Sequence, residues 1–79
     1  MSYFGVQLYP NPNNGKFMIE GLNKGSVYQV FDINGRILSS GRVSSSIHEI
    51  DLDLTSEGVY YIQSEIDGNT SRLRFMVIK

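Results

Sequence analysis

Only one histidine, His48, is available for acid–base chemistry in this sequence of 79 residues. A serine hydrolase would need that imidazole beside a serine nucleophile and an orienting carboxylate. Serines are plentiful, but none stands in a nucleophile-elbow motif or another catalytic signature. With 0 cysteines, the chain also lacks a thiol nucleophile, thiolate metal ligands and disulfides. We therefore expect His48 to be a solvated strand residue. We also expect no catalytic residues and a protein that is not an enzyme.

Three acidic residues, Glu49, Asp51 and Asp53, alternate along one segment. If that segment is a strand, their carboxylates share a face and could bind a calcium ion. The spacing alone is unspecific, because calcium usually recruits loop carbonyls as well. We therefore expect no metal site, and instead a face that is solvated or paired across strands with arginines, namely Arg36, Arg42, Arg72 or Arg74.

Neither the glycines nor the aromatic residues form a recognisable cofactor site. No glycine group has the GxxxxGK[ST] spacing that presents amides to a phosphate, so we expect turn glycines and no cofactor. Exposed aromatics on one sheet could form a platform for stacking sugars. In so small a domain we expect most of them in the core, with Tyr61 the most exposed.

Charge and hydropathy restrict the partners. The formal net charge of −1 provides no polycationic surface, so we expect neither nucleic-acid binding nor attraction to anionic membranes. No apolar run approaches the roughly 20 residues that span a bilayer, so we expect no membrane insertion. A domain of this length buries only about 60% of its unfolded surface, which leaves a thin stability margin.

Period-two alternation between turn signals recurs along the chain, and helical periodicity is absent. The predicted strands are residues 6–9, 16–20, 26–33, 36–42, 47–54, 59–66 and 72–78. The pairs Asn34-Gly35 and Asp67-Gly68 predict hairpin turns. For Asn34-Gly35 we predict a two-residue turn of type I′, because both residues accept positive φ. The pattern predicts an all-β, immunoglobulin-like Greek-key sandwich of about seven mainly antiparallel strands, the number of a constant-type domain. Because alternation begins near Val6, we expect residues 1–5 to be a linker remnant and residues 6–79 to be one domain.

The segment from Tyr9 to Gly15 reads YPNPNNG. Its prolines exclude a helix and hold the preceding residues, Tyr9 and Asn11, in extended geometry. Its asparagines and Gly15 tolerate positive φ. We predict an extended edge segment that turns sharply into the strand at residues 16–20.

Gly58 precedes Tyr60 by two positions at the start of a late strand, after Leu54. This spacing resembles the tyrosine corner of Greek-key sandwiches, in which the phenol donates to the backbone a few residues upstream. We expect Tyr60 to be a structural tyrosine corner of this kind. Its neighbour Tyr61 then faces the opposite side of the strand and matters less to the fold.

Three segments in series carry a family resemblance: YPNPNNGKFMIEGL, VYQVFDINGRILSSGRV and IHEIDLDLTSEGVYYIQSEIDGNTSRLRFMVIK. From about Val6 to Lys79, the chain resembles the C-terminal sorting domain (type A) of proteins exported by the Bacteroidetes type IX, or Por, secretion system. The glycine-rich motif of the family matches residues 58–60. Its turn glycine and basic-apolar last strand match Gly68 and residues 72–79, with arginines rather than lysines at positions 72 and 74.

The resemblance implies a non-catalytic secretion signal fused behind a passenger. The outer-membrane translocon and its shuttle protein would recognise the signal after transit through the periplasm. The passenger would reach the outer-membrane surface or the extracellular space, and a sortase-like cell-surface protease would commonly remove the domain. The residues expected at the translocon contact are Gly58, Tyr60, Gly68, Arg72, Leu73, Arg74, Phe75, Met76, Val77, Ile78 and Lys79.

The alternation in residues 72–79 predicts a strand with two different faces. Leu73, Phe75 and Val77 lie on one face, and Arg72, Arg74, Met76 and Ile78 lie on the other. A partner could add a strand to it or bind it in a groove, or its apolar residues could simply complete a sheet. The alternative function is a carbohydrate- or peptide-binding sandwich appended to an extracellular enzyme. That function predicts a row of exposed aromatics and tolerance of truncation at the last strand.

Overall fold

The structure is a computed structural model that describes residues 2–3, 6–52, 56–66 and 68–78. These residues form eight strands. The strands are β1 (Ser2–Tyr3), β2 (Val6–Tyr9), β3 (Lys16–Glu20), β4 (Val27–Phe31), β5 (Ile37–Arg42), β6 (Ile47–Asp51), β7 (Gly58–Ile66) and β8 (Asn69–Val77). The described part of the chain contains no helix that could cross a membrane.

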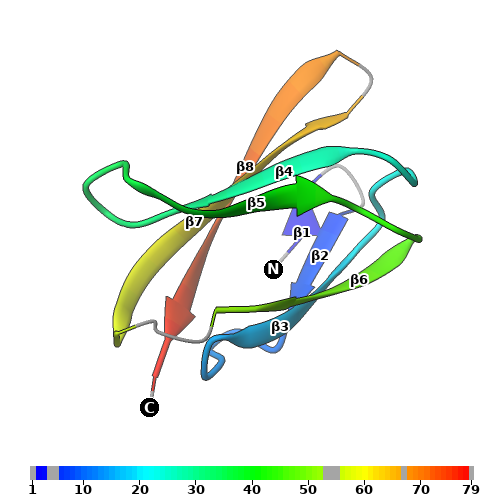
Figure 1. The fold of residues 1–79 in the computed structure, drawn as a ribbon. Coiled ribbons are helices and arrows are strands. Elements are labelled where there is room, and N and C mark those ends of the chain that lie inside the picture. The colour runs from blue at the N-terminus through cyan, green and yellow to red at the C-terminus, as the bar shows by residue number, and fades with distance from the viewer. Residues whose placement is uncertain (1, 4–5, 53–55, 67, 79) are drawn as a thin grey trace.

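Two four-stranded sheets lie face to face (Figure 1), with strand orders β1-β2-β3-β6 and β5-β4-β7-β8. Neighbouring strands within each sheet are antiparallel. The predicted all-β sandwich is therefore confirmed. The strand beyond the expected seven is β1, which pairs with β2 and extends the first sheet to Ser2 rather than Val6.

The core fills the space between the sheets and follows the predicted alternation. In β3, Phe17 and Ile19 are each 1% exposed, whereas Lys16 is exposed. The rings of Phe17 in the first sheet and Phe75 in the second lie 4.6 Å apart, so large apolar side chains of both sheets meet at the centre. Burial of this kind is the main source of stability in a domain without disulfides.

The placement of β5 differs from that in a constant-type domain. There, the fourth of the seven strands pairs in the sheet of the first, second and fifth strands. Counted from β2, the fourth strand of this chain is β5. It pairs with β4 in the other sheet. The short connection of residues 32–36 explains this difference, because it returns the chain directly alongside β4.

The Asn-Gly turn also differs in detail from the prediction of a two-residue type I′ turn. The Gly35 N–H donates to the Asp32 carbonyl over 3.0 Å, so the turn is centred on residues 33 and 34. Gly35 follows with a φ of 84°, as in hairpins that combine a tight turn with a bulge. The Asp32 carboxylate stabilises this geometry by accepting from the N–H groups of Asn34 and Arg36. At the second predicted hairpin, Ile66 pairs with Asn69, so the chain reverses between these two residues as expected.

Candidate functional site

The last strand, β8, divides the predicted contact residues between two faces. Leu73, Phe75 and Val77 are at most 4% exposed and belong to the core. Arg72, Arg74, Met76 and Ile78 are exposed on the outer side of the second sheet. In the folded domain, a partner can therefore contact the second set directly but not the first. Lys79 lies outside the described residues.

Arg72 sits at the centre of a small polar and aromatic group that spans three strands. Its guanidinium carbon lies 5.6 Å from the ring centroid of Phe31 and 5.9 Å from that of Tyr61. Its Nη2 donates to Gln63 Oε1 over 2.8 Å. The register of β4, β7 and β8 creates this group, because Phe31 pairs with Tyr61, and Gln63 pairs with Arg72. Cation–π attraction and the hydrogen bond both orient the guanidinium.

Phe31 and Gln63 are not among the residues that the sequence predicted for the contact. The available signal was the period-two pattern, which places Phe31 and Gln63 on the outward-facing side of their strands. The sequence did not give the register that aligns them with Arg72. Tyr61 is half-buried. The prediction that it is the most exposed aromatic residue is wrong, because Tyr9 is 39% exposed.

The free edge of β8 is partly occupied by the YPNPNNG segment. The Asn13 N–H donates to the Met76 carbonyl over 3.0 Å, and the Asn13 carbonyl accepts from the Ile78 N–H over 2.8 Å. The Asn11 side chain accepts from the Met76 N–H over 3.1 Å. An added strand cannot pair with this stretch of β8 unless residues 11–13 are displaced. The strand β1 also lies beside β8.

The Asn13 side chain holds the YPNPNNG segment in this position. It is buried, donates to the Pro10 carbonyl over 3.1 Å and accepts from the Gly15 N–H over 2.9 Å. The peptide bonds before Pro10 and Pro12 are both cis. The asparagines of this segment therefore act mainly as hydrogen-bonding groups, a role beyond the tolerance of positive φ that the sequence indicated.

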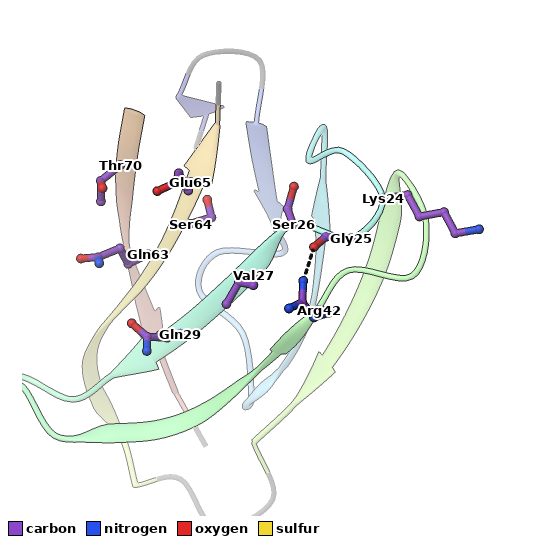
Figure 2. Close-up of a pocket in the computed structure, with 10 residues that line it drawn as sticks. All are labelled: Lys24, Gly25, Ser26, Val27, Gln29, Arg42, Gln63, Ser64, Glu65 and Thr70. Atoms are coloured by element: carbon purple, nitrogen blue, oxygen red, sulfur yellow. Dashed lines mark hydrogen bonds between the residues drawn. The ribbon is translucent and has the colours of Figure 1, made fainter. Parts of the chain in front are cut away.

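Two hollows lie at the ends of the outer face of the second sheet. The upper hollow is the one near the turn between β7 and β8, and the lower hollow is the one near the end of β8. The upper hollow, of about 620 Å³, is shown in Figure 2 and is lined by Lys24, Gly25, Ser26, Val27, Gln29, Arg42, Gln63, Ser64, Glu65 and Thr70. At its margin, Arg42 donates to the Gly25 carbonyl over 3.1 Å, and Lys24 points away. The lower hollow, of about 310 Å³, is lined by Asn11, Pro12, Val59, Arg74, Phe75 and Met76. The exposed arginines of β8 lie along the surface between them.

Tyr60 is held by a hydrogen bond and a ring contact, and Gly58 has a positive φ. The Tyr60 hydroxyl donates to the Ser56 carbonyl over 2.6 Å, which is the backbone bond of a tyrosine corner. The Tyr60 ring is 7% exposed and stacks on Phe75 with centroids 5.9 Å apart. Gly58 has a φ of 153°, and Gly68, in the hairpin turn, has a φ of 81°. Of the predicted contact residues, Tyr60 is therefore enclosed in the fold.

His48 is half-buried rather than solvated, which corrects the sequence expectation. Its ring packs 5.5 Å from the ring of Tyr28. Its Nδ1 lies 3.3 Å from both the N–H and the hydroxyl oxygen of Ser44. Because the backbone N–H donates to Nδ1, that nitrogen already serves as an acceptor that closes the turn before β6.

Among the described residues, no strand that carries an arginine lies beside the acidic face of β6. Its strand neighbour is β3, where Asp51 pairs with Lys16 and Glu49 with Met18. Of the two expected alternatives, the solvated face therefore holds for Glu49 and Asp51, which are exposed, and the pairing with arginines does not. Asp53 lies outside the described residues. Within the described ranges, no group of three His, Asp or Glu side chains could hold a metal ion.

The comparisons with known proteins agree with this arrangement. The family model for the secretion system C-terminal sorting domain matches residues 7–79. The search of curated proteins finds no match. A similar solved structure is that of PorZ, an essential bacterial surface component of the type-IX secretion system of Porphyromonas gingivalis. The TM-score is 0.75 at 26% identity, covering 95% of this chain and 12% of that chain.

This chain therefore corresponds in extent to a small part of PorZ. The family match, in contrast, runs over nearly the whole sequence, since it covers residues 7–79 of 79. The fold, the position of β8 and the family match lead to the same conclusion. The chain belongs to the family of secretion system C-terminal sorting domains, and it is a type IX secretion signal that implies export to the cell surface or the extracellular space.

Proposed function

We propose that this domain acts in its folded form as the export signal of a passenger fused to its N-terminal side. The passenger passes through the periplasm, and the translocon and shuttle protein of the type IX system recognise the folded domain. A sortase-like protease then removes the domain at the cell surface. The domain itself contributes recognition and no catalysis.

The observation that carries this proposal is the double role of β8. The same strand supplies Phe75 to the core and presents Arg74 and Met76 to solvent. The outward side chains take their fixed positions only when the inward ones are packed. A receptor that contacts this face therefore distinguishes a folded domain from an unfolded one.

The alternative function, a carbohydrate- or peptide-binding module, predicted a row of exposed aromatics. Among the described aromatic side chains, Tyr9 alone is exposed, and it lies on the first sheet, away from Phe31 and Tyr61, which are half-buried. Stacking of sugars on a row of rings requires several exposed aromatic faces on one surface. The described surface therefore favours the export signal.

A reporter fusion tests the proposal. A reporter with an inner-membrane export signal is joined to this domain and expressed in a type IX-competent bacterium, and the fraction outside the cell is measured. We expect export of the fusion, periplasmic retention of the reporter alone, and retention of both in a type IX-deficient strain. We also expect the exported reporter to be shorter by the mass of the domain.

Deletion of β8 is a poor test, because it removes three core side chains along with the outer face. Loss of the Phe75 ring alone costs about 3–5 kcal/mol, which is comparable with the whole stability of many small domains. Phe75→Ala is therefore the variant that tests the need for folding, with Met18→Ala on the outside of β3 as its control. Periplasmic retention of the wild-type fusion, or equal export without the domain, would reject the proposed function.

A further inference from the structure

We propose that the outer side of β4, β7 and β8 docks on an acidic protein surface of the export machinery. This inference rests on the proposed function and adds the chemistry of the partner. The docking surface, called the arginine face below, consists of Phe31, Val59, Tyr61, Arg72, Arg74 and Met76. These side chains alternate with core residues along their strands and point away from the core.

Charges are segregated between the two sides of the sandwich. On the outside of the second sheet, the described strand residues include three arginines and one carboxylate: Arg42, Arg72, Arg74 and Glu65. On the outside of the first sheet, they include three carboxylates and one lysine: Glu20, Glu49, Asp51 and Lys16. The net charge of −1 conceals this asymmetry. A partner with negative charge is therefore attracted to one side and repelled by the other.

The two arginines of β8 have unused donors that face solvent. Arg72 is oriented by Phe31, Tyr61 and Gln63, and it forms no ion pair with a described residue. Arg74 is exposed, with neither a hydrogen bond nor an ion pair to the described part of the chain. A guanidinium presents paired N–H groups that match a carboxylate in a bidentate contact. Orientation before binding also lowers the entropy lost when that contact forms.

The composition of the arginine face favours a protein partner over an anionic lipid surface. Protein interfaces are enriched in aromatic residues, methionine and arginine, and depleted in lysine. The face contains Arg72, Arg74, Tyr61, Phe31 and Met76, and the four strands of its sheet contain no lysine. Surfaces that bind anionic lipids usually carry clusters of four or more basic residues, often lysines.

The geometry also favours contact through side chains rather than strand addition. Residues 11–13 occupy the edge of β8 next to Met76 and Ile78. The lower hollow of about 310 Å³ lies beside Arg74 and is lined in part by Pro12, Val59 and Met76. An apolar side chain of the partner can enter this hollow while an adjacent carboxylate binds Arg74. This combination of an apolar pocket and a charged contact is typical of interface hot spots.

Charge reversal at one position on each side of the sandwich provides the test. R74E and K16E change the net charge equally, and neither side chain forms a hydrogen bond to a described residue. We expect R74E to reduce export of the reporter fusion by about tenfold or more, and K16E to leave it near the wild-type level. R72K, which retains the charge but loses the planar fork, should give a partial loss. Thermal unfolding of each fusion checks that the domain remains folded.

A photo-crosslinking side chain at position 76 or 18 identifies the partner class. We expect a crosslink to a type IX protein from position 76 on the arginine face and none from position 18 on the opposite sheet. Substituting lysine for a carboxylate at the crosslinked site should restore export of R74E. Phosphatidylglycerol vesicles test the alternative of a lipid partner. Binding of the fusion to these vesicles should be weak, and R74E should not change it.

The outcomes separate the two proposals. If the wild-type fusion is exported and R74E is exported equally well, the proposed function stands and the arginine face is not the docking surface. If R74E abolishes vesicle binding and position 76 crosslinks to no protein, the partner is a membrane and the inference is overturned. If the wild-type fusion is not exported, the proposed function fails, and the inference fails with it.

Discussion

Gly41 lies directly against the ring of Tyr28, its cross-strand partner in β4. A Cβ atom at position 41 would lie 3.0 Å from the Tyr28 hydroxyl oxygen and 3.3 Å from two of its ring carbons. Tyr28 is 8% exposed and packs on His48, so its ring has little freedom to move. A side chain at position 41, near the end of β5, would therefore press on the ring across the strand pair.

The first prediction concerns this contact. Gly41→Ala should lower the free energy of unfolding by about 1–3 kcal/mol, because the buried ring must shift to admit the methyl group. Urea denaturation of the purified domain measures the change. Ser40→Ala, on the exposed side of the same strand, should change stability by no more than about 0.5 kcal/mol. Tyr28→Phe should relieve part of the Gly41→Ala effect, and equal losses in both backgrounds would contradict this explanation.

The Tyr60 hydroxyl supports a second prediction. Tyr60→Phe removes the 2.6 Å bond to the Ser56 carbonyl but keeps the ring that stacks on Phe75. We expect a loss of about 1 kcal/mol or somewhat more in the free energy of unfolding. Tyr61→Phe, on the other side of the same strand, is the matched control and should have a smaller effect. Similar losses for the two variants would show that the corner bond does not stabilise the fold.

The buried Asn13 side chain supports a third prediction. Asn13→Ala leaves the Pro10 carbonyl and the Gly15 N–H without their side-chain partner and should cost about 1–3 kcal/mol. It should also speed hydrogen exchange at the Ile78 amide, which donates to the Asn13 carbonyl. Asn14→Ala is the control, because it removes only an exposed hydrogen bond of 3.2 Å that the Lys16 backbone N–H donates to the Asn14 side chain. Unchanged exchange at Ile78 would mean that this side chain does not hold the segment on β8.

A fourth prediction concerns pH and the turn between β4 and β5. The pKa of Asp32 is lowered from its ordinary value, first because the Arg36 N–H donates to the carboxylate, and further by the Arg36 guanidinium 3.0 Å away. Because the pKa is lower in the folded state, the stabilisation is present above the unfolded pKa of about 3.9. It is lost as the pH falls through the lowered folded pKa.

Carboxyl chemical shifts in an NMR titration measure this pKa directly. Arg36→Ala should raise the Asp32 pKa only partly, because the backbone N–H bonds from residues 34 and 36 remain. Asp32→Asn should remove this residue's contribution to the acid dependence of stability. An Asp32 pKa at or above the ordinary value in the wild-type domain would contradict the prediction.

Local sequence patterns were sufficient for much of this fold. Alternation placed Phe17 and Phe75 in the core and Arg72 and Arg74 outside, because successive residues of a strand face opposite sides. The Asp-Gly pair located the reversal between β7 and β8, since glycine accepts the left-handed backbone that such a turn requires. The spacing of Gly58 and Tyr60 likewise indicated the bond to the backbone upstream. Each of these features depends on residues close together in the chain.

The tertiary structure decided which distant segments meet. Asn11 and Met76 are separated by 65 positions, and no local pattern indicates that the first accepts a hydrogen bond from the second. The contact of Phe31 with Arg72 and the position of β5 beside β4 depend in the same way on register between strands. Register and sheet membership are set by packing among segments that are remote in sequence. The residue types therefore determined the strands and their two faces, and the folded chain alone brought Arg72, Phe31 and Tyr61 into one surface.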